Sequence, residues 1–251
     1  VYDEATRRAV ASFQTDQGLI GDGDDDPTTA RALAAAHPSD HQTTAPLPGD
    51  DDTVRPPPST PEGGRSGTIY LAFADGPSPV TPQMLDLLQR AGAKATFFVD
   101  AGQVAGSPET LRNMASNGDG IGVTAGPHNA ASPVATDALF RTLSADQEAV
   151  AAVVGRTPAC LLAPYGAGDP ASRGRATAAG LRPVVWNADP QDWRHPGGLV
   201  IATDVVANAR PGSIILLHDG GGDRAQTVTA LGTLLTSLVG LGYGFAAIPG
   251  C

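Results

Sequence analysis

The sequence is poor in basic residues. Lysine and arginine together number 16, against 26 aspartates and glutamates, so the formal net charge is −10 over 251 residues. A protein that tracks phosphates or binds anionic membranes needs an excess of positive charge, so this balance argues against nucleic acid and anionic lipid as partners. Long apolar runs are also lacking, and no window approaches the roughly 18 residues that a membrane span requires. We therefore expect neutral partners and no membrane span.

Cysteine is almost absent. Cys160 lies in an apolar run, and Cys251 is the last residue. A cysteine at the end of a short Ile-Pro-Gly-Cys tail is well placed to pin the C-terminus to a core strand through a disulfide. Such a bond would imply an oxidising compartment, whereas two free thiols are the alternative.

One segment, residues 37–66, has no apolar periodicity and is rich in proline, threonine, serine and aspartate. This composition cannot bury enough apolar surface to fold, and the prolines keep the chain extended. We interpret it as a linker of the kind common in secreted wall proteins, in which His37 and His41 are more simply solvated residues than metal ligands. The chain then divides into a small unit (1–36), this linker and a large unit (67–251).

The small unit, residues 1–36, has apolar residues at helical spacing. A first helix is expected to end near Gly18 and a second to follow Pro27. The pattern resembles the last two thirds of the three-helix peptidoglycan-binding module of bacterial wall hydrolases, which implies a partial module. The acidic run at 22–26 lacks the spacing of a calcium loop and is more simply a solvated turn.

The large unit alternates short apolar runs with helical patterns. The runs predict seven buried strands, at Thr68–Ala74, Ala95–Val99, Gly120–Val123, Cys160–Ala163, Pro183–Trp186, Ser213–Leu217 and Gly244–Ile248. Thr81 before Pro82 and Ser107 before Pro108 are typical of helix starts. Because strands separated by helices pair in parallel, and seven of them favour a closed arrangement, we predict an α/β fold with a distorted (β/α)7 barrel.

Polar and aromatic residues follow successive strands of the predicted barrel. Because the carboxyl ends of barrel strands meet at one mouth, we expect these residues to converge there. They are Asp75, Thr124, His128, Pro164, Tyr165, Asp189, Asp192, Trp193, His218 and Asp219. One such residue often only caps a helix, but five strand ends of this kind in one barrel indicate a functional pocket.

Five stretches of the large unit occur in an order and spacing typical of one enzyme family. They read FADGP, GIGVTAGPH, APYGA, NADPQDW and ILLHDGGGD. Over residues 67–251 the chain resembles the polysaccharide deacetylases, carbohydrate esterase family four, which remove N-acetyl or O-acetyl groups from peptidoglycan, chitin or xylan. The resemblance implies a secreted, wall-associated protein that meets peptidoglycan or a chitin-like N-acetylated glycan, and we expect a monomer.

The family holds a metal ion, usually zinc, with an Asp-His-His set that this chain matches only in part. Asp75 matches the metal-binding aspartate and His128 the second histidine, but Thr124 stands in place of the first. A catalytic zinc needs three protein ligands and a water, and a threonine hydroxyl is a poor ligand. We therefore expect a weak or vacant zinc site.

The groups that activate water in the family are also replaced. Ala74 occupies the position of the general base, and Leu162 that of the arginine paired with the base. A positioned general base contributes about 10²–10⁴ in rate, and metal activation of water would be the remaining route to a nucleophile. An arginine left beside Ala74 would be a partly buried, unpaired cation, so each loss relieves the other.

The same resemblance implies that the general acid and the residues that accompany it are retained. His218 matches the general acid, Asp192 the aspartate that orients it, and Tyr165 the residue whose backbone N–H contributes to the oxyanion site. Pro164, Tyr165 and Trp193 are candidate substrate-binding residues, although Trp193 could also belong to the core.

These losses favour a deacetylase homologue that binds glycan without standard catalysis. A first alternative is an enzyme with rewired chemistry, in which Asp75, His128, Asp192 and His218 act on another substrate. A second is an interaction module whose barrel scaffolds a protein partner.

Overall fold

The computed structural model describes residues 15, 20, 67–124, 142–162 and 170–251, the last range without the side chains of 170–172. The helical module expected over 1–36 and the linker over 37–66 therefore lie outside the described residues, except for Thr15 and Ile20. Three of the expected site residues also lie outside them: His128, Pro164 and Tyr165.

Seven strands form a parallel sheet, and each matches one of the seven predicted strands with shifted ends. They are β1 (Gly67–Gly76), β2 (Thr96–Val99), β3 (Gly120–Thr124), β4 (Cys160–Leu162), β5 (Arg182–Val184), β6 (Ile214–His218) and β7 (Tyr243–Phe245). The strand order is β5-β4-β3-β2-β1-β6, and β7 pairs with the first residues of β1.

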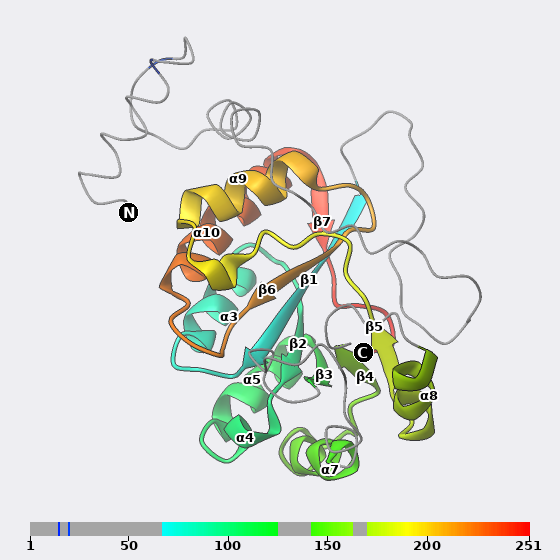
Figure 1. The fold of residues 1–251 in the computed structure, drawn as a ribbon. Helices are drawn as coiled ribbons and strands as arrows, with labels where there is room; N and C mark the ends of the chain where they lie inside the picture. The colour runs from blue at the N-terminus through cyan, green and yellow to red at the C-terminus, as the bar shows by residue number, and fades with distance from the viewer. Residues whose placement is uncertain (1–14, 16–19, 21–66, 125–141, 163–169) are drawn as a thin grey trace.

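The sheet curls toward a closed barrel (Figure 1). Beyond the end of β5, Ala188 forms a parallel bridge with Ile215 of β6, and the Leu216 N–H donates to the Ala188 carbonyl oxygen at 2.9 Å. The Asn187 side-chain oxygen accepts from the Ile214 N–H, also at 2.9 Å. These bonds join the segment that follows β5 to β6, at the other edge of the sheet. The predicted distorted (β/α) barrel is therefore confirmed.

Helices cover the outer face of the curled sheet (Figure 1). They are α3 (Thr81–Arg90), α4 (Ala101–Val104), α5 (Pro108–Asn117), α7 (Leu143–Val154), α8 (Pro170–Ala178), α9 (Gly198–Asn208) and α10 (Ala225–Gly240), with the 3-10 helix η2 (Asp192–Arg194). None of the helices in the described ranges is long and apolar enough to cross a membrane.

The helix starts differ in part from the prediction. Ser107 does precede α5, although its side chain makes no cap hydrogen bond. Thr81 lies inside the first turn of α3, after Val80. Its hydroxyl donates instead to Asp219 Oδ2 at 2.7 Å, because both side chains are buried and the carboxyl needs a donor there.

The alternation of β1 separates two apolar layers. Ile69, Leu71 and Phe73 pack outward against the helices, while Ala72 and Ala74 face the inside of the curl. We call the inside layer the inner cluster; it consists of Ala72, Ala74, Phe98, Cys160, Leu162, Val184, Ile214, Leu216, Ile248 and Cys251. The small alanines of β1 let the sheet close around the larger side chains.

The C-terminal tail closes the barrel at the end opposite the mouth. The Sγ atoms of Cys160 and Cys251 lie at bonding distance, 2.02 Å apart. Arg156 donates to the Cys251 carbonyl oxygen at 2.9 Å, and the Ile248 N–H donates to the Thr96 hydroxyl oxygen at 2.8 Å. The tail is therefore held by side chains at the starts of β2 and β4 as well as by the cysteine pair.

Candidate active site

A buried aspartate and histidine meet at the carboxyl end of β6. His218 is the last residue of that strand, and its Nδ1 lies 2.7 Å from Asp192 Oδ1 at the start of η2. Asp192 Oδ2 accepts from the His218 backbone N–H at 2.9 Å and from the Thr227 hydroxyl of α10 at 2.7 Å. Three hydrogen bonds from two elements thus lock Asp192, which is 1% exposed.

The pairing sets the charge of both partners. Burial by itself raises the pKa of Asp192, but the hydrogen bonds from His218 and Thr227 outweigh it and hold that pKa below its ordinary value. Burial by itself lowers the pKa of His218, yet the hydrogen bond and charge of Asp192 raise it. Since Nδ1 is committed to Asp192, Nε2 is the ring nitrogen through which His218 could give a proton to a ligand.

A second buried carboxyl stands directly after this histidine. Asp219 is 1% exposed, and burial raises its pKa to about 7. Its Oδ2 accepts from Thr81, whereas its Oδ1 has no hydrogen-bond partner. The carboxyl packs against the Cα of Gly76, where any side chain would collide with it. Asp219 therefore links the end of β6 to the turn between β1 and α3.

Asp75 turns out of its strand. Its backbone lies in the left-handed region, with φ at 67°, at a bulge where the pairing of β1 with β2 shifts register. Such a conformation costs a non-glycine residue about 1–3 kcal/mol and is found most often at functional sites. The irregularity brings Asp75 to the edge of a cleft rather than into the inner cluster.

The two positions expected to have lost catalytic groups are filled by closed apolar packing. Ala74 and Leu162 are both 0% exposed and belong to the inner cluster together with Phe98. Ala74 lies in register with His218 of β6, while Leu162 lies in register with Thr124 of β3. The structure thus brings Ala74 and Asp75 beside His218, and places Thr124 and Leu162 together on the neighbouring strands β3 and β4, which β2 separates from β1.

The described residues do not form a zinc site with three protein ligands. In 67–124, 142–162 and 170–251, no three His, Cys, Asp or Glu side chains gather closely enough to hold a metal. Two of the three residues expected to hold the metal, Asp75 and Thr124, lie in these ranges. Asp75 offers a carboxylate, and Thr124, which is 2% exposed, offers a hydroxyl. His128 lies outside the described residues, so the weak site remains a prediction.

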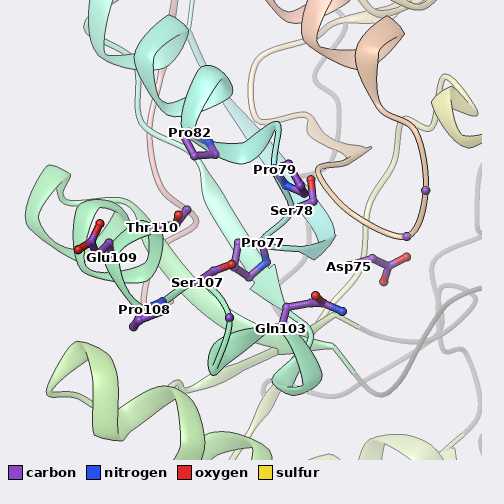
Figure 2. A pocket seen from close by; sticks show the side chains of 13 residues that line it. Asp75, Pro77, Ser78, Pro79, Pro82, Gln103, Ser107, Pro108, Glu109 and Thr110 are labelled. Carbon is purple, nitrogen blue, oxygen red and sulfur yellow. The ribbon is translucent and has the colours of Figure 1, made fainter.

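A cleft of about 830 Å³ opens at Asp75 and runs along the turn after β1 to the start of α5. Figure 2 shows Asp75 at one end of the labelled set and Glu109 at the other, with Pro77 and Ser107 between them.

The two tryptophans differ in exposure. Trp193 is 45% exposed on η2, with the Arg194 guanidinium carbon 4.7 Å from its ring centroid, so it is not part of the core. Trp186 is half-buried and packs against the inner cluster. Sugar stacking on Trp193 stays a prediction.

Two functional-site contacts escaped the sequence analysis. Thr227 lies mid-helix in α10 with no local signature, and only the fold brings it to Asp192. Thr81 was expected as a helix cap, and its bond to Asp219 joins residues 138 positions apart. Rules based on local residue spacing cannot predict hydrogen bonds between residues so far apart in the sequence.

Comparisons with known proteins agree with the fold and identify the family. A family model described as polysaccharide deacetylase matches residues 62–184. A chitooligosaccharide deacetylase from Rhizobium leguminosarum bv. trifolii is 35% identical over 199 residues, covering 74% of this chain and 93% of the relative. A peptidoglycan-N-acetylglucosamine deacetylase from Bacillus cereus is 37% identical over 183 residues, covering 72% and 85% respectively.

Solved structures give the same result. A family 4 carbohydrate esterase from Streptomyces lividans, in complex with acetate, superposes with a TM-score of 0.65 at 29% identity, covering 72% of this chain and 93% of that one. The mutant of BA3943, a CE4 family pseudoenzyme with restored activity, shares the fold at 22% identity, with a TM-score of 0.64 and coverage of 73% and 66%. On these grounds the chain belongs to the polysaccharide deacetylase family.

Proposed function

We propose that this chain is an extracellular, wall-associated member of the family that binds glycan and has lost metal-dependent deacetylation. The observation that carries the proposal is the complete burial of Ala74 and Leu162 within one apolar cluster. In this arrangement no carboxylate stands at the base position and no arginine pairs with it. Among the described residues, apolar side chains fill both positions, which supports the loss of both roles.

The retained half of the site supports binding. Asp192 is hydrogen-bonded to His218 and Thr227, and the exposed ring of Trp193 follows Asp192 in sequence. A buried, satisfied polar network of this kind holds a mouth in one shape whether or not chemistry occurs there. By the family resemblance, Tyr165 and Pro164 are further residues that we propose to contact the glycan.

The glycan class follows from the relatives. Those named above act on chitooligosaccharides and peptidoglycan, which share N-acetylglucosamine, and the net charge of −10 suits a ligand that is not anionic. An oxidised Cys160–Cys251 pair would agree with a location outside the cell. In this proposal the 1–36 module and the 37–66 linker tether a monomeric barrel to the wall.

The test combines metal content with turnover. Purified protein is dialysed against zinc, its bound metal is measured, and acetate release from an N-acetylglucosamine oligomer is followed beside an intact relative. We expect substoichiometric zinc and no acetate above background, together with measurable binding of the oligomer. One zinc per chain with turnover near that of the relative would end the proposal.

A second candidate, an active hydrolase with an atypical site, is favoured by one observation. The Asp192–His218 pair keeps a raised histidine pKa and a committed Nδ1, which are properties of a proton donor. Under this candidate, an activated acetyl ester would be hydrolysed at a rate that falls strongly in His218→Gln. Equal background rates in both proteins would dismiss it.

A further inference from the structure

The short helix η2 is held in a fixed conformation at the barrel mouth. Its first residue, Asp192, is buried and hydrogen-bonded to His218 and Thr227. The residues that flank η2, Gln191 and His195, both have left-handed backbones, with φ at 53° and 56°. Such a conformation costs a non-glycine residue about 1–3 kcal/mol and clusters at active sites and ligand clamps. The backbone of the two residues between Asp192 and His195 is therefore well fixed.

Those two residues, Trp193 and Arg194, form an exposed stacked pair. The guanidinium carbon of Arg194 lies 4.7 Å from the centroid of the Trp193 ring, within the range of a cation–π contact. Trp193 is 45% exposed, whereas the other large apolar side chains that are exposed in the described part of the chain are aliphatic: Ile20, Val200 and Val239. An aromatic ring left in water beside an arginine is common at binding surfaces.

The fold does not use the guanidinium of Arg194. Over the described ranges, this group makes no hydrogen bond and no ion pair besides its contact with the Trp193 ring. Several other arginines donate to main-chain carbonyl oxygens and so stabilise turns or the tail: Arg156, Arg182, Arg210 and Arg224. The donors of Arg194 are thus available to a ligand.

One carboxylate lies near this guanidinium without binding it. Asp189 is close enough for the charge of Arg194 to act on its pKa, which burial raises. Its Oδ1 accepts instead from the Gln191 N–H at 2.8 Å, and no salt bridge joins Asp189 to Arg194 in the structure of these described residues. An internal carboxylate therefore does not occupy the guanidinium.

The chemistry of a free guanidinium selects a carboxylate. Its planar fork gives two parallel N–H···O bonds to carboxylate oxygens, and charge-assisted bonds are roughly twice as strong as neutral ones. The net charge of −10 argues against a polyanion that covers the surface. A single carboxylate, however, meets mainly the local charge, because charges more than about 8–10 Å away are screened at physiological salt.

The two glycans on which the relatives act differ in this group. A chitooligosaccharide is uncharged, whereas every second sugar of peptidoglycan is N-acetylmuramic acid, whose lactyl ether ends in a carboxylate. We infer that Arg194 binds this sugar carboxylate, with its guanidinium held by the Trp193 ring. The inference rests on the proposed function and narrows its ligand from N-acetylated glycans in general to those that carry a carboxylate on the sugar. Arg194 is then the residue that distinguishes peptidoglycan from a chitin-like chain.

The test is titration calorimetry of the full-length chain with three tetrasaccharides. The first is an N-acetylglucosamine tetramer, the second alternates N-acetylglucosamine with N-acetylmuramic acid and carries no peptide, and the third is the second with its carboxylates converted to amides. We expect the acidic tetrasaccharide to bind about tenfold more tightly than either neutral one, the effect of one charge-assisted contact. This preference should shrink at high ionic strength, because salt screens an exposed charge pair.

Two variants and a control locate the effect. Arg194→Gln should abolish the preference and keep the affinity for the N-acetylglucosamine tetramer. Arg194→Lys keeps the charge but loses the planar fork, so it should retain only part of the preference. Arg112→Gln, which removes an exposed arginine of α5, should leave all three affinities unchanged. Thermal unfolding checks that each variant is folded.

The outcomes separate the two proposals. Equal affinity for the acidic tetrasaccharide and its amide, or a preference that survives in Arg194→Gln, overturns this inference and leaves the proposed function standing. Binding of none of the three tetrasaccharides overturns the proposed function itself. The free stem peptide, which also ends in a carboxylate, is a fourth ligand: if it binds as tightly as the acidic tetrasaccharide, Arg194 recognises a peptide carboxylate, and the assignment to the sugar is wrong.

Discussion

The hydroxyl of Thr227 in α10 donates to Oδ2 of Asp192 in η2 at 2.7 Å, and both residues are buried. The bond ties the last long helix to the loop that orients His218. It also gives the buried carboxylate a donor that water cannot supply there.

Removing this hydroxyl should weaken the protein. We expect Thr227→Val, which keeps the shape of the side chain, to lower the free energy of unfolding by roughly 1–3 kcal/mol, the range for a buried hydrogen bond to a charged group. The His218 pKa, followed by NMR, should shift because its partner is less firmly held. Thr229→Val is the matched control, since that hydroxyl is exposed and bonds only to the preceding turn of its own helix. An equal loss in both variants would show that helix propensity, and not the contact, is responsible.

Asp219 should make stability fall as pH rises. Its pKa is raised from 3.8 to about 7 in the folded chain, so the folded state holds a proton that the unfolded state releases between these values. Stability from this group is thus full below 3.8 and is lost progressively toward pH 7. Asp219→Asn, which stays neutral, should flatten that part of the urea-unfolding profile. Asp86→Asn, an exposed change, should not; a wild-type slope retained in Asp219→Asn would contradict the assignment.

The positions of the lost base and arginine should be energetically coupled. Leu162→Arg alone places an unpaired cation in the inner cluster and should cost about 3–5 kcal/mol, while Ala74→Asp alone places an unpaired carboxylate there. The double variant should lose less than the sum of the two single losses. Chemical unfolding of all four proteins measures the coupling, and strict additivity would mean that the two side chains do not meet.

Adding the missing metal ligand should restore chemistry. The triple variant Ala74→Asp, Thr124→His, Leu162→Arg is expected to bind zinc and to release acetate from an N-acetylglucosamine oligomer, because base, ligand and paired cation return together. Each double variant serves as its control and should remain inactive. If the folded triple variant gains neither metal nor turnover, the pocket has diverged beyond these positions.

The cysteine pair should stabilise the chain through its long loop. Cys160 and Cys251 are 91 positions apart, so cross-linking them restricts the unfolded chain and should contribute about 2–5 kcal/mol. Cys251→Ser and reduced wild-type protein should therefore show the same fall in Tm. A reductant that has no effect on the wild-type Tm would indicate free thiols in the native protein.

Local sequence patterns determined most of the fold. Seven short apolar runs correspond to seven parallel strands, because a strand buried on both faces must be apolar throughout. The pairing is parallel because a helix connects each strand to the next. The same logic predicts from the sequence alone that Asp75, Asp192 and His218 lie at one mouth, since barrel strands all end on the same side.

The tertiary structure decided the contacts that join distant segments. Helix-start rules predict that Thr81 caps a helix. In the structure its hydroxyl donates instead to the buried carboxyl of Asp219, 138 positions away. Thr227 reached Asp192 only because β6 and α10 fold back over η2. The sequence could say that Ala74 and Leu162 lack catalytic groups; only packing showed that both are sealed in an apolar layer, because burial depends on the side chains that surround a residue and not on the residue alone.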